Sequence, residues 1–255
     1  MSSKKKELSF SLSDLNILIL GAKLGIGASL ARICAEQNAN VILVDKEEPI
    51  ELADNLRQLA VANIVTYGCD ISNRDAVESL AAELSQRNYS PHSVALTAGI
   101  TFYNDWLETD NETWDRDVEQ IFNVNLAGPI NVARSFLPIM EKNNWGRMVL
   151  VGSIAGRMGG LTSQPHYAAS KGGVHSLTRW LASKYAPSGV LVNAVAPGPT
   201  KTRMTEGRSI DTSKLPLRRM LDPEDIAWPI AFLLSPAAAG MVGVVLDVNG
   251  GATFS

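Results

Sequence analysis

The sequence predicts an α/β protein with one doubly wound, mainly parallel sheet of seven strands and helices on both faces. Two observations support this fold class. Short apolar runs alternate with segments of helical periodicity along almost the whole chain. Several runs, among them VILV, MVLV and VLVNAVA, are almost continuously apolar, as is typical of parallel strands buried on both sides. Repeated strand–helix alternation with right-handed crossovers then places helices on both faces of the sheet.

Seven apolar runs are expected to form strands, and the segments between them to form helices. The helix after the first strand carries an apolar stripe that includes Leu30 and Ile33. A later helix follows Ser72, a predicted N-cap, and places Val77 and Leu80 on one face. The expected strands are, in chain order, Asn16–Leu20, Asn40–Asp45, Ile64–Asp70, Ser93–Thr97, Arg147–Ser153, Val190–Ala196 and Val244–Asn249.

The composition bounds the number of domains. The chain has 255 residues, of which 45% are hydrophobic and 19% are charged, as in an ordinary globular protein. This length allows one large α/β domain or two small ones. Because no Pro/Gly/Ser-rich linker and no repeat interrupts the pattern, we expect a single domain over residues 1–255, with residues 1–13 as a flexible tail.

Charge and cysteine content exclude several classes of protein. A formal net charge of −3 argues against a nucleic-acid surface, which usually carries a basic excess. No long apolar segment follows the lysines at positions 4–6, so neither a signal peptide nor a membrane span is expected. Cys34 and Cys69 fit neither a zinc spacing nor a disulfide framework, and we expect both to be reduced and buried. The sequence predicts a cytoplasmic protein with no metal, no membrane and no nucleic acid as partner.

A glycine-rich turn follows the first strand. Gly21, Gly25 and Gly27 form the pattern G-x-x-x-G-x-G, which differs from the G-x-G-x-x-G fingerprint of dinucleotide binding and also suits a plain flexible turn. Glycines at a strand–helix junction let the backbone approach a pyrophosphate at the helix N-terminus. The second strand ends at Asp45, close to the separation at which an acidic residue binds the ribose hydroxyls. Together the two features predict a dinucleotide site.

Tyr167 and Lys171 form the strongest catalytic pair. They are four positions apart in a helical region, so they share one helix face, although an exposed tyrosine beside a surface lysine has the same spacing. A phenol with a pKa of about 10 is a poor base at neutral pH, and lowering this pKa by about 3 takes about 4 kcal/mol. A lysine cation at about 4 Å supplies a similar energy at an effective dielectric constant of about 20. Lys171 is therefore predicted to bring Tyr167 into the catalytic range.

Seven stretches in a fixed order extend this picture over almost the whole chain, from Asp14 to Gly251. They are LGAKLGIG, CDIS, FNVNLAGP, VLVGSIAG, YAASK, VNAVAPGPTKT and PLRRMLDPEDIAWPIAFLLSPAAAGMVGVVLDVNGG. In this order and spacing the chain resembles the classical short-chain dehydrogenase/reductase family. The resemblance implies a Rossmann-type fold, and it assigns roles to individual residues.

Four catalytic roles are implied by the resemblance. Tyr167 would be the general acid/base that exchanges a proton with the substrate hydroxyl or carbonyl. Lys171 would lower the pKa of Tyr167 and also bind the nicotinamide ribose. Ser153 would donate a hydrogen bond to the reacting oxygen, and Asn125 would hold a water that relays protons between Lys171 and solvent.

The resemblance also implies a nicotinamide dinucleotide as cofactor. Asp45 would bind both hydroxyls of the adenosine ribose and repel a 2′-phosphate, which favours NAD over NADP, while the nearby cations Lys23 and Lys46 act against this preference. The implied cofactor-binding residues are Gly21, Lys23, Gly25, Ile26, Gly27, Asp45, Asp70, Ile71, Ala98, Gly99, Tyr167, Lys171, Pro197, Gly198, Thr200 and Thr202.

The chain departs from the family pattern at several positions. Leu96-Thr97 replaces the usual Asn-Asn after the fourth strand, which makes the contacts of that strand with its neighbour uncertain. Ser153 and Tyr167 are one residue further apart than usual, and Asn249 replaces an aspartate. The lid between Thr202 and Pro216 is short, which suggests an open or shallow pocket.

Two histidines and a tryptophan lie near the implied site. His166 is expected to face a neighbouring side chain or solvent rather than the substrate, and His175 is expected to pack inside the protein. Trp106 lines either the pocket mouth, the core or an interface.

We expect an NAD(H)-dependent alcohol dehydrogenase or carbonyl reductase that acts on a small-molecule secondary alcohol or ketone. The alternative enzyme is an NADPH-dependent 3-oxoacyl-carrier-protein reductase; Asp45 argues against it, as do Asn144 and Ser188, which stand where such reductases place arginines. A catalytically silent NAD-binding regulator is the alternative from another class. The resemblance further implies a homotetramer.

Overall fold

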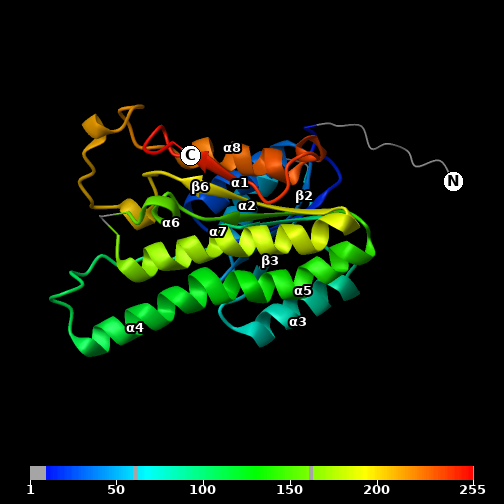
Figure 1. Cartoon of the computed structure of the whole chain (residues 1–255). Coiled ribbons are helices and arrows are strands. Elements are labelled where there is room, and N and C mark those ends of the chain that lie inside the picture. The colour runs from blue at the N-terminus through cyan, green and yellow to red at the C-terminus, as the bar shows by residue number, and fades with distance from the viewer. Residues whose placement is uncertain (1–9, 60–61, 161–162, 255) are drawn as a thin grey trace.

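The computed structural model describes residues 10–59, 62–160 and 163–254, and Figure 1 shows their arrangement. Seven strands form one sheet in the order β3-β2-β1-β4-β5-β6-β7, and all neighbouring strands in it are parallel. The predicted doubly wound sheet is confirmed. Its strands are β1 (Asn16–Leu20), β2 (Asn40–Asp45), β3 (Ile64–Gly68), β4 (Ser93–Leu96), β5 (Gly146–Val151), β6 (Val190–Pro197) and β7 (Val245–Val248).

Helices connect the strands and cover the sheet. The α-helices of the described chain are α1 (Gly25–Glu36), α2 (Ile50–Leu59), α3 (Arg74–Gln86), α4 (Asn111–Phe122), α5 (Gly128–Lys142), α6 (Ala155–Met158), α7 (Pro165–Tyr185) and α8 (Pro223–Leu234). The shorter helical segments are the π-helical η1 (Asn123–Ala127) and the 3-10 helices η2 (Ala186–Ser188), η3 (Arg203–Thr205), η4 (Thr212–Lys214) and η5 (Pro236–Ala238).

Two hydrophobic cores lie on opposite faces of the sheet. Leu18 and Leu20 of β1 belong to the core beneath α3, α5 and α7, whereas Ile17 and Ile19 belong to the core beneath α1, α2 and α8. This follows from the two-residue period of a strand, which sends successive side chains to opposite faces. Figure 1 shows the first helix layer below the sheet and the second above it. Burial of β1 on both sides explains its continuous apolar sequence.

The strands begin within one residue of the predicted positions, but four of them end earlier than predicted. The residues just past these four ends are Asp70, Thr97, Ser153 and Asn249. Because all strands run in one direction, their carboxyl ends meet at one edge of the sheet. The loops that leave this edge carry the candidate site.

Two local predictions require correction. The N-cap of α3 is Asn73, whose side-chain oxygen accepts the Ala76 N–H at 3.1 Å, rather than Ser72. The Ser72 hydroxyl instead donates to the Asp70 carboxylate. The described end of the predicted tail is also packed: Leu12 is fully buried, and the ring of Phe10 lies against that of Phe232 on α8. Residues 1–9 of that tail lie outside the described residues.

Both cysteines are free and buried, as predicted. Over residues 10–59, 62–160 and 163–254, none of the helices combines the length and the apolarity needed to cross a membrane. The same residues contain no group of three or more His, Cys, Asp or Glu side chains that is suited to holding a metal ion.

Candidate active site

The four predicted catalytic residues come from three neighbouring segments. Ser153 lies just past the end of β5, and Tyr167 and Lys171 lie on the first two turns of α7. Proline at position 165 suits the first turn of α7, where a backbone N–H has no partner inside the helix. Asn125 lies in the middle of η1, between α4 and α5. The structure therefore brings together residues that are up to 46 positions apart, from Asn125 to Lys171.

Lys171 is buried, and its ammonium donates a hydrogen bond to the Val151 carbonyl oxygen at 2.9 Å. Burial lowers the pKa of Lys171 to about 8. The backbone of Gly99 lies close by, because a Cβ atom on Gly99 would stand 3.2 Å from the lysine Nζ. Gly99 thus leaves room for this cation at the carboxyl end of β4.

In the chain without a cofactor, the pKa of Tyr167 lies above its ordinary value rather than below it. Burial raises the pKa of the Tyr167 phenol to about 12, and the Tyr103 phenol also raises it, while a hydrogen bond with Ser153 acts in the opposite direction. The ammonium of Lys171 lies 5.8 Å from the centre of the Tyr167 ring. Its donated hydrogen bond goes to Val151, so it does not offset the desolvation of the phenol.

Asn125 is held in place by a closed set of hydrogen bonds. Its side-chain oxygen accepts the Ile100 N–H and its amide donates to the Ile100 carbonyl, both at 2.9 Å. The same amide donates to the Ser170 hydroxyl at 3.2 Å, and that hydroxyl donates to the Tyr167 carbonyl at 2.8 Å. Single π-helical turns inside α-helices often mark functional sites. Here the π turn aims Asn125 at the loop after β4 and at α7.

Ser170 was missed in the sequence analysis. It is fully buried and connects Asn125 to the turn of α7 that carries Tyr167. Its position three residues after Tyr167 places it on the same helix face, which is the signal that identifies it.

The two histidines play different structural parts. His175 is buried, its pKa is lowered to about 4 mainly by burial, and its neutral Nε2 is 3.5 Å from the Ser153 backbone N–H. A Cβ on Gly152 would be 2.3 Å from this Nε2, so the ring packs directly against the backbone before Ser153. His166 packs edge-on against Trp114, with ring centres 5.2 Å apart, as expected for a residue that faces a neighbour.

The glycine turn forms a tight junction between β1, α1 and the loop after β4. A Cβ on Gly21 would lie 2.3 Å from the Ala98 backbone nitrogen, and one on Gly27 would lie 2.0 Å from the Gly21 carbonyl oxygen. Gly25 has a φ of +56° and only Thr202 near its Cβ position, at 3.2 Å. Within the described chain, no side chain caps the N-terminus of α1, which leaves its N–H groups for an anion. The turn therefore fits a pyrophosphate.

Charged residues surround the end of β2. The Asp45 carboxylate accepts the backbone N–H of Lys23 at 2.9 Å and that of Lys46 at 2.8 Å. The side chain of Lys46 pairs with Asp70 at 3.0 Å, and that of Lys23 pairs with Glu47. Both predicted cations are thus engaged by carboxylates.

The other predicted cofactor residues differ in whether their side chains reach the glycine turn. Thr202 reaches the glycine turn, whereas the Thr200 hydroxyl donates to the Gly198 carbonyl at 2.9 Å. The Ile71 side chain is buried against Gly128 and is therefore part of the core. Pro197 ends β6, the strand that leads into the Gly198–Thr202 segment.

The substitutions after β4 and β7 keep the strands connected. The Thr97 hydroxyl donates to the carbonyls of Leu20 and Gly21 at 2.9 and 3.0 Å, and Leu96 is buried in the core. Asn249 donates to the Thr253 carbonyl and accepts the Gly251 N–H. Threonine therefore makes the contact with β1 that the sequence left uncertain.

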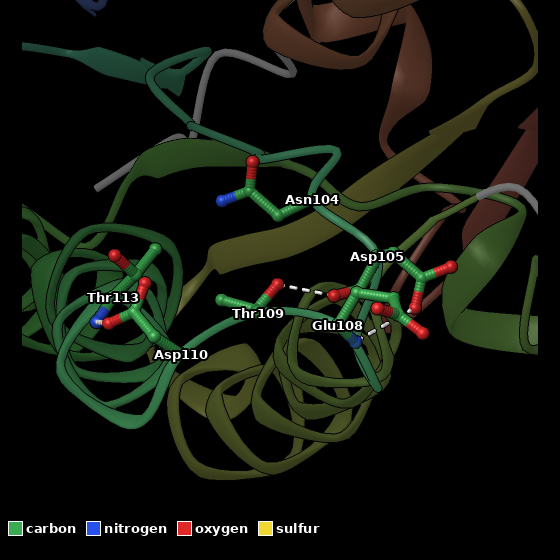
Figure 2. A pocket seen from close by; sticks show the side chains of 6 residues that line it. All are labelled: Asn104, Asp105, Glu108, Thr109, Asp110 and Thr113. Atoms are coloured by element: carbon green, nitrogen blue, oxygen red, sulfur yellow. Dashed lines mark hydrogen bonds between the residues drawn. The ribbon is translucent and has the colours of Figure 1, made fainter.

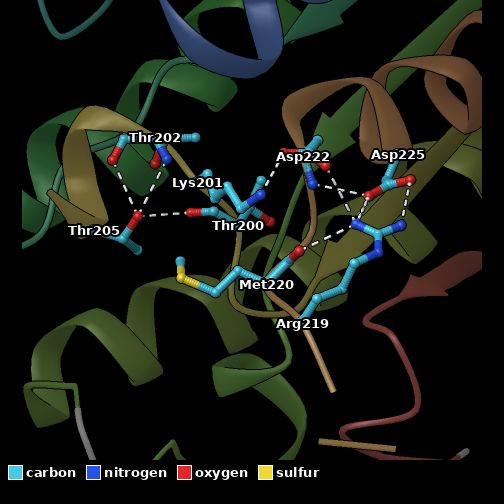
Figure 3. A network of polar contacts seen from close by, with 8 residues as sticks. All are labelled: Thr200, Lys201, Thr202, Thr205, Arg219, Met220, Asp222 and Asp225. Atoms are coloured by element: carbon cyan, nitrogen blue, oxygen red, sulfur yellow. Dashed lines mark hydrogen bonds and ion pairs between the residues drawn. The ribbon is translucent and has the colours of Figure 1, made fainter. Parts of the chain in front are cut away.

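We define the lid as residues 203–215. Polar contacts of the residues on either side of it gather at the start of α8 (Figure 3). Lys201 pairs with Asp222 at 3.0 Å, and Arg219 binds Asp225 through two hydrogen bonds of 2.6 and 3.1 Å. Arg219 also reaches Asp222, at 3.4 Å. Both ends of the lid are thus tied to the N-terminal turn of α8.

The loop after β4 borders the site on the other side. A polar hollow of about 250 Å³ lies in this loop and at the start of α4. Figure 2 shows the side chains that line it. Its lining residues are Asn104, Asp105, Glu108, Thr109, Asp110 and Thr113. Asp105 accepts the backbone N–H groups of Leu107 and Glu108, and Asp110 caps α4. None of the four predicted catalytic residues lines this hollow.

Comparisons with known proteins agree with this geometry. Residues 21–253 match the family described as "Enoyl-(Acyl carrier protein) reductase". The chain is 36% identical over 258 residues to galactitol 2-dehydrogenase (L-tagatose-forming) of Cereibacter sphaeroides, covering 96% of this chain and 97% of that one.

Two solved structures share the fold. A 3-oxoacyl-(acyl-carrier protein) reductase from Brucella melitensis with bound NAD has a TM-score of 0.86 and 28% identity, covering 100% of this chain and 97% of that one. The second structure is a candidate NAD(P)-dependent gluconate 5-dehydrogenase from Beutenbergia cavernae with NADP at low occupancy. It has a TM-score of 0.87 and 32% identity, and the match covers 95% of this chain and 98% of that one. The chain is an oxidoreductase that belongs to the classical short-chain dehydrogenase/reductase family.

Proposed function

We propose that the protein is an NAD(H)-dependent oxidoreductase that interconverts a secondary alcohol and its ketone, with Tyr167 as general acid/base. The observation that carries this proposal is the cluster formed by Ser153, Tyr167, Lys171 and Asn125 at the carboxyl edge of the sheet. A silent NAD-binding regulator has no chemical need for this arrangement.

The chain's own residues perform the proton chemistry. A raised pKa keeps the Tyr167 phenol protonated at neutral pH, so it is ready to donate its proton to a ketone oxygen. The Ser153 hydroxyl, which interacts with this phenol, holds the same oxygen. Nicotinamide, when bound, supplies the hydride. The reverse reaction requires the phenolate, which Lys171 stabilises once its ammonium is turned from Val151 toward the cofactor ribose and the phenol.

Proton exchange with solvent runs through the polar groups behind Tyr167. Asn125 holds Ile100 and Ser170, and its side-chain oxygen would lie 3.4 Å from a Cβ on Gly99 beside the Lys171 ammonium. A water held between Asn125 and Lys171 would complete this path.

The charges near β2 support NAD as the cofactor. Asp45 is the carboxylate at the ribose position, and both nearby lysines are engaged by other carboxylates. A 2′-phosphate at this place would face Asp45 without a free lysine to balance it. Arg203, which is close enough to Lys23 to lower its pKa, acts against this preference. NADPH-dependent reduction of a 3-oxoacyl carrier substrate is the alternative.

A cytoplasmic homotetramer acting on a small-molecule alcohol or ketone is the form we propose. The test is a screen of secondary alcohols and ketones with NAD(H) and with NADP(H), followed by nicotinamide absorbance. Turnover with NAD(H) that is lost in Tyr167→Phe supports the proposal. Cofactor binding with no turnover of any substrate would favour the regulator instead.

A further inference from the structure

The lid and the loop after β4 meet through an arginine and a tyrosine. The guanidinium carbon of Arg208 lies over the Tyr103 ring, 3.5 Å from its centre, so the cation is in direct contact with the ring face. Tyr103 also neighbours the catalytic tyrosine, because its phenol contributes to the raised pKa of Tyr167. Tyr103 therefore connects the lid guanidinium to the reacting end of the site.

Arg208 differs from three other cations on or beside the lid. Lys201, Lys214 and Arg219 each bind an aspartate on the lid or at its ends. The Arg208 side chain is partly buried and forms no ion pair with any residue in the described part of the chain. Tyr103 covers one side of the guanidinium, whose N–H groups have no hydrogen-bond partner among the described residues.

An arginine that contacts an aromatic ring and has no ion pair is suited to binding an oxyanion. The planar guanidinium binds carboxylate or phosphate through two parallel hydrogen bonds, and stacking on a ring fixes its plane beforehand. We propose that Arg208, oriented by Tyr103, binds an oxyanion group of the substrate. The substrate is then a ketone or secondary alcohol that also carries a carboxylate or phosphate. This inference rests on the proposed function of Tyr167.

Nearby acidic residues increase the need for a cation at Arg208 when the substrate is an anion. Asp105, Glu108 and Asp110 line the hollow in the loop that carries Tyr103 (Figure 2). The negative potential of these carboxylates disfavours an anionic substrate unless a cation balances it. Removing the charge of Arg208 should therefore affect anionic substrates selectively.

The experiment compares substrates that differ in charge. The probes are 5-oxohexanoate, its neutral methyl ester and acetoacetyl-CoA, each assayed with the wild type and with Arg208→Gln. We expect Arg208→Gln to raise KM about tenfold or more for an oxyanion-bearing substrate and to leave the ester within about twofold. Lys214→Gln, which removes a charge from the same lid away from Tyr103, is the matched control.

The outcomes distinguish a carboxylate of the substrate from the phosphates of a carrier as the group that Arg208 binds. A selective loss with 5-oxohexanoate assigns a carboxylate close to the carbonyl, and a selective loss with acetoacetyl-CoA assigns the phosphates of a carrier. Equal effects on ester and anions, or equal effects of Arg208→Gln and Lys214→Gln, overturn the proposal. Tyr103→Phe should keep the selectivity because the ring remains, whereas Tyr103→Ala should reduce it.

A binding measurement separates this inference from the proposed function. Calorimetric titration of the protein with 5-oxohexanoate and with its ester needs no turnover. If no substrate reacts but Arg208→Gln weakens binding of the anion alone, the inference stands and the proposed reaction fails. If Tyr167→Phe abolishes turnover while Arg208→Gln has no selective effect in either assay, the reaction stands and the inference fails.

Discussion

At the scale of single residues, the site is dominated by buried groups whose ionisation is unfavourable. Lys171 sits beside a backbone carbonyl with no carboxylate bonded to it among the described residues, and its pKa falls to about 8. Tyr167 has its pKa raised to about 12. Both shifts are caused mainly by desolvation, which penalises the charged form of each group. In the chain alone, the proposed catalytic pair therefore carries a desolvation cost that a bound cofactor would be expected to offset.

Lys171 should reduce the stability of the unliganded protein. Its folded pKa lies below the value of 10.5 in the unfolded chain, so the cost of burying the cation is present below about pH 8 and disappears as the pH rises toward 10.5. Lys171→Met should stabilise the protein at pH 7 by about 1 kcal/mol or more. Chemical denaturation at pH 7 and pH 10 measures this difference, which should shrink at the higher pH. A variant that is less stable at pH 7 would contradict the prediction.

Tyr167 should remain protonated over the working pH range when no cofactor is bound. The phenolate absorbance of the wild type minus that of Tyr167→Phe should show no ionisation of this residue below about pH 10. The same variant should bind NAD nearly as well as the wild type and lose almost all turnover, because the phenol acts on the substrate. A phenolate signal near pH 7 without cofactor would show that Lys171 already acts on the tyrosine.

At the scale of elements, the ends of the strands determine which groups meet. Asp45 ends β2, and two backbone N–H groups orient its carboxylate. Replacing Asp45 by Ser removes the repulsion of a 2′-phosphate and the contact with the ribose hydroxyls. The ratio of kcat/KM for NADH over NADPH should then fall by about tenfold or more. An unchanged ratio, or a wild type that prefers NADPH, would contradict the role given to Asp45.

The strands, and the position of Tyr167 and Lys171 on one helix face, could be predicted because their signals are local. An apolar run reports burial on both faces, and Tyr167 and Lys171 share a helix face at a spacing of four. The π turn at Asn125 could not be predicted, because it depends on hydrogen bonds to Ile100 and Ser170, which are distant in sequence. The raised pKa of Tyr167 in the absence of cofactor could not be predicted for a similar reason: spacing gives the approach of Lys171 but not the desolvation of either group.

At the scale of the whole molecule, exposed apolar side chains indicate where copies of the chain would contact one another. Helices α4, α5 and α7 form one layer of the fold (Figure 1), and large apolar side chains remain exposed on it, among them Ile130 and Trp180. Val242 and Phe254 are exposed in the C-terminal part of the chain. In the homotetramer that the family resemblance implies, the segments 111–141 and 165–186 would pack across one two-fold axis and 237–250 across another. The exposed apolar side chains suit such contacts.

Light scattering at micromolar concentration should therefore give a mass of about four chains. Trp180→Glu places a charge on the α7 surface and should reduce that mass, whereas Leu59→Glu, at an exposed apolar residue of α2 outside these segments, is the control for charge alone. A monomeric wild type would rule out the tetramer.

The glycine turn also determines which substitutions the protein can tolerate during evolution. Gly21 and Gly27 leave no space for even a methyl group, since the nearest backbone atoms would lie 2.3 and 2.0 Å away. Random variants at these two positions should disappear from any population selected for folding alone, even where no cofactor is ever supplied. Gly25 has its nearest obstacle at 3.2 Å, in a threonine methyl group. The φ of +56° at Gly25 also disfavours other side chains, so selection at Gly25 should combine a requirement of folding with the need for the cofactor.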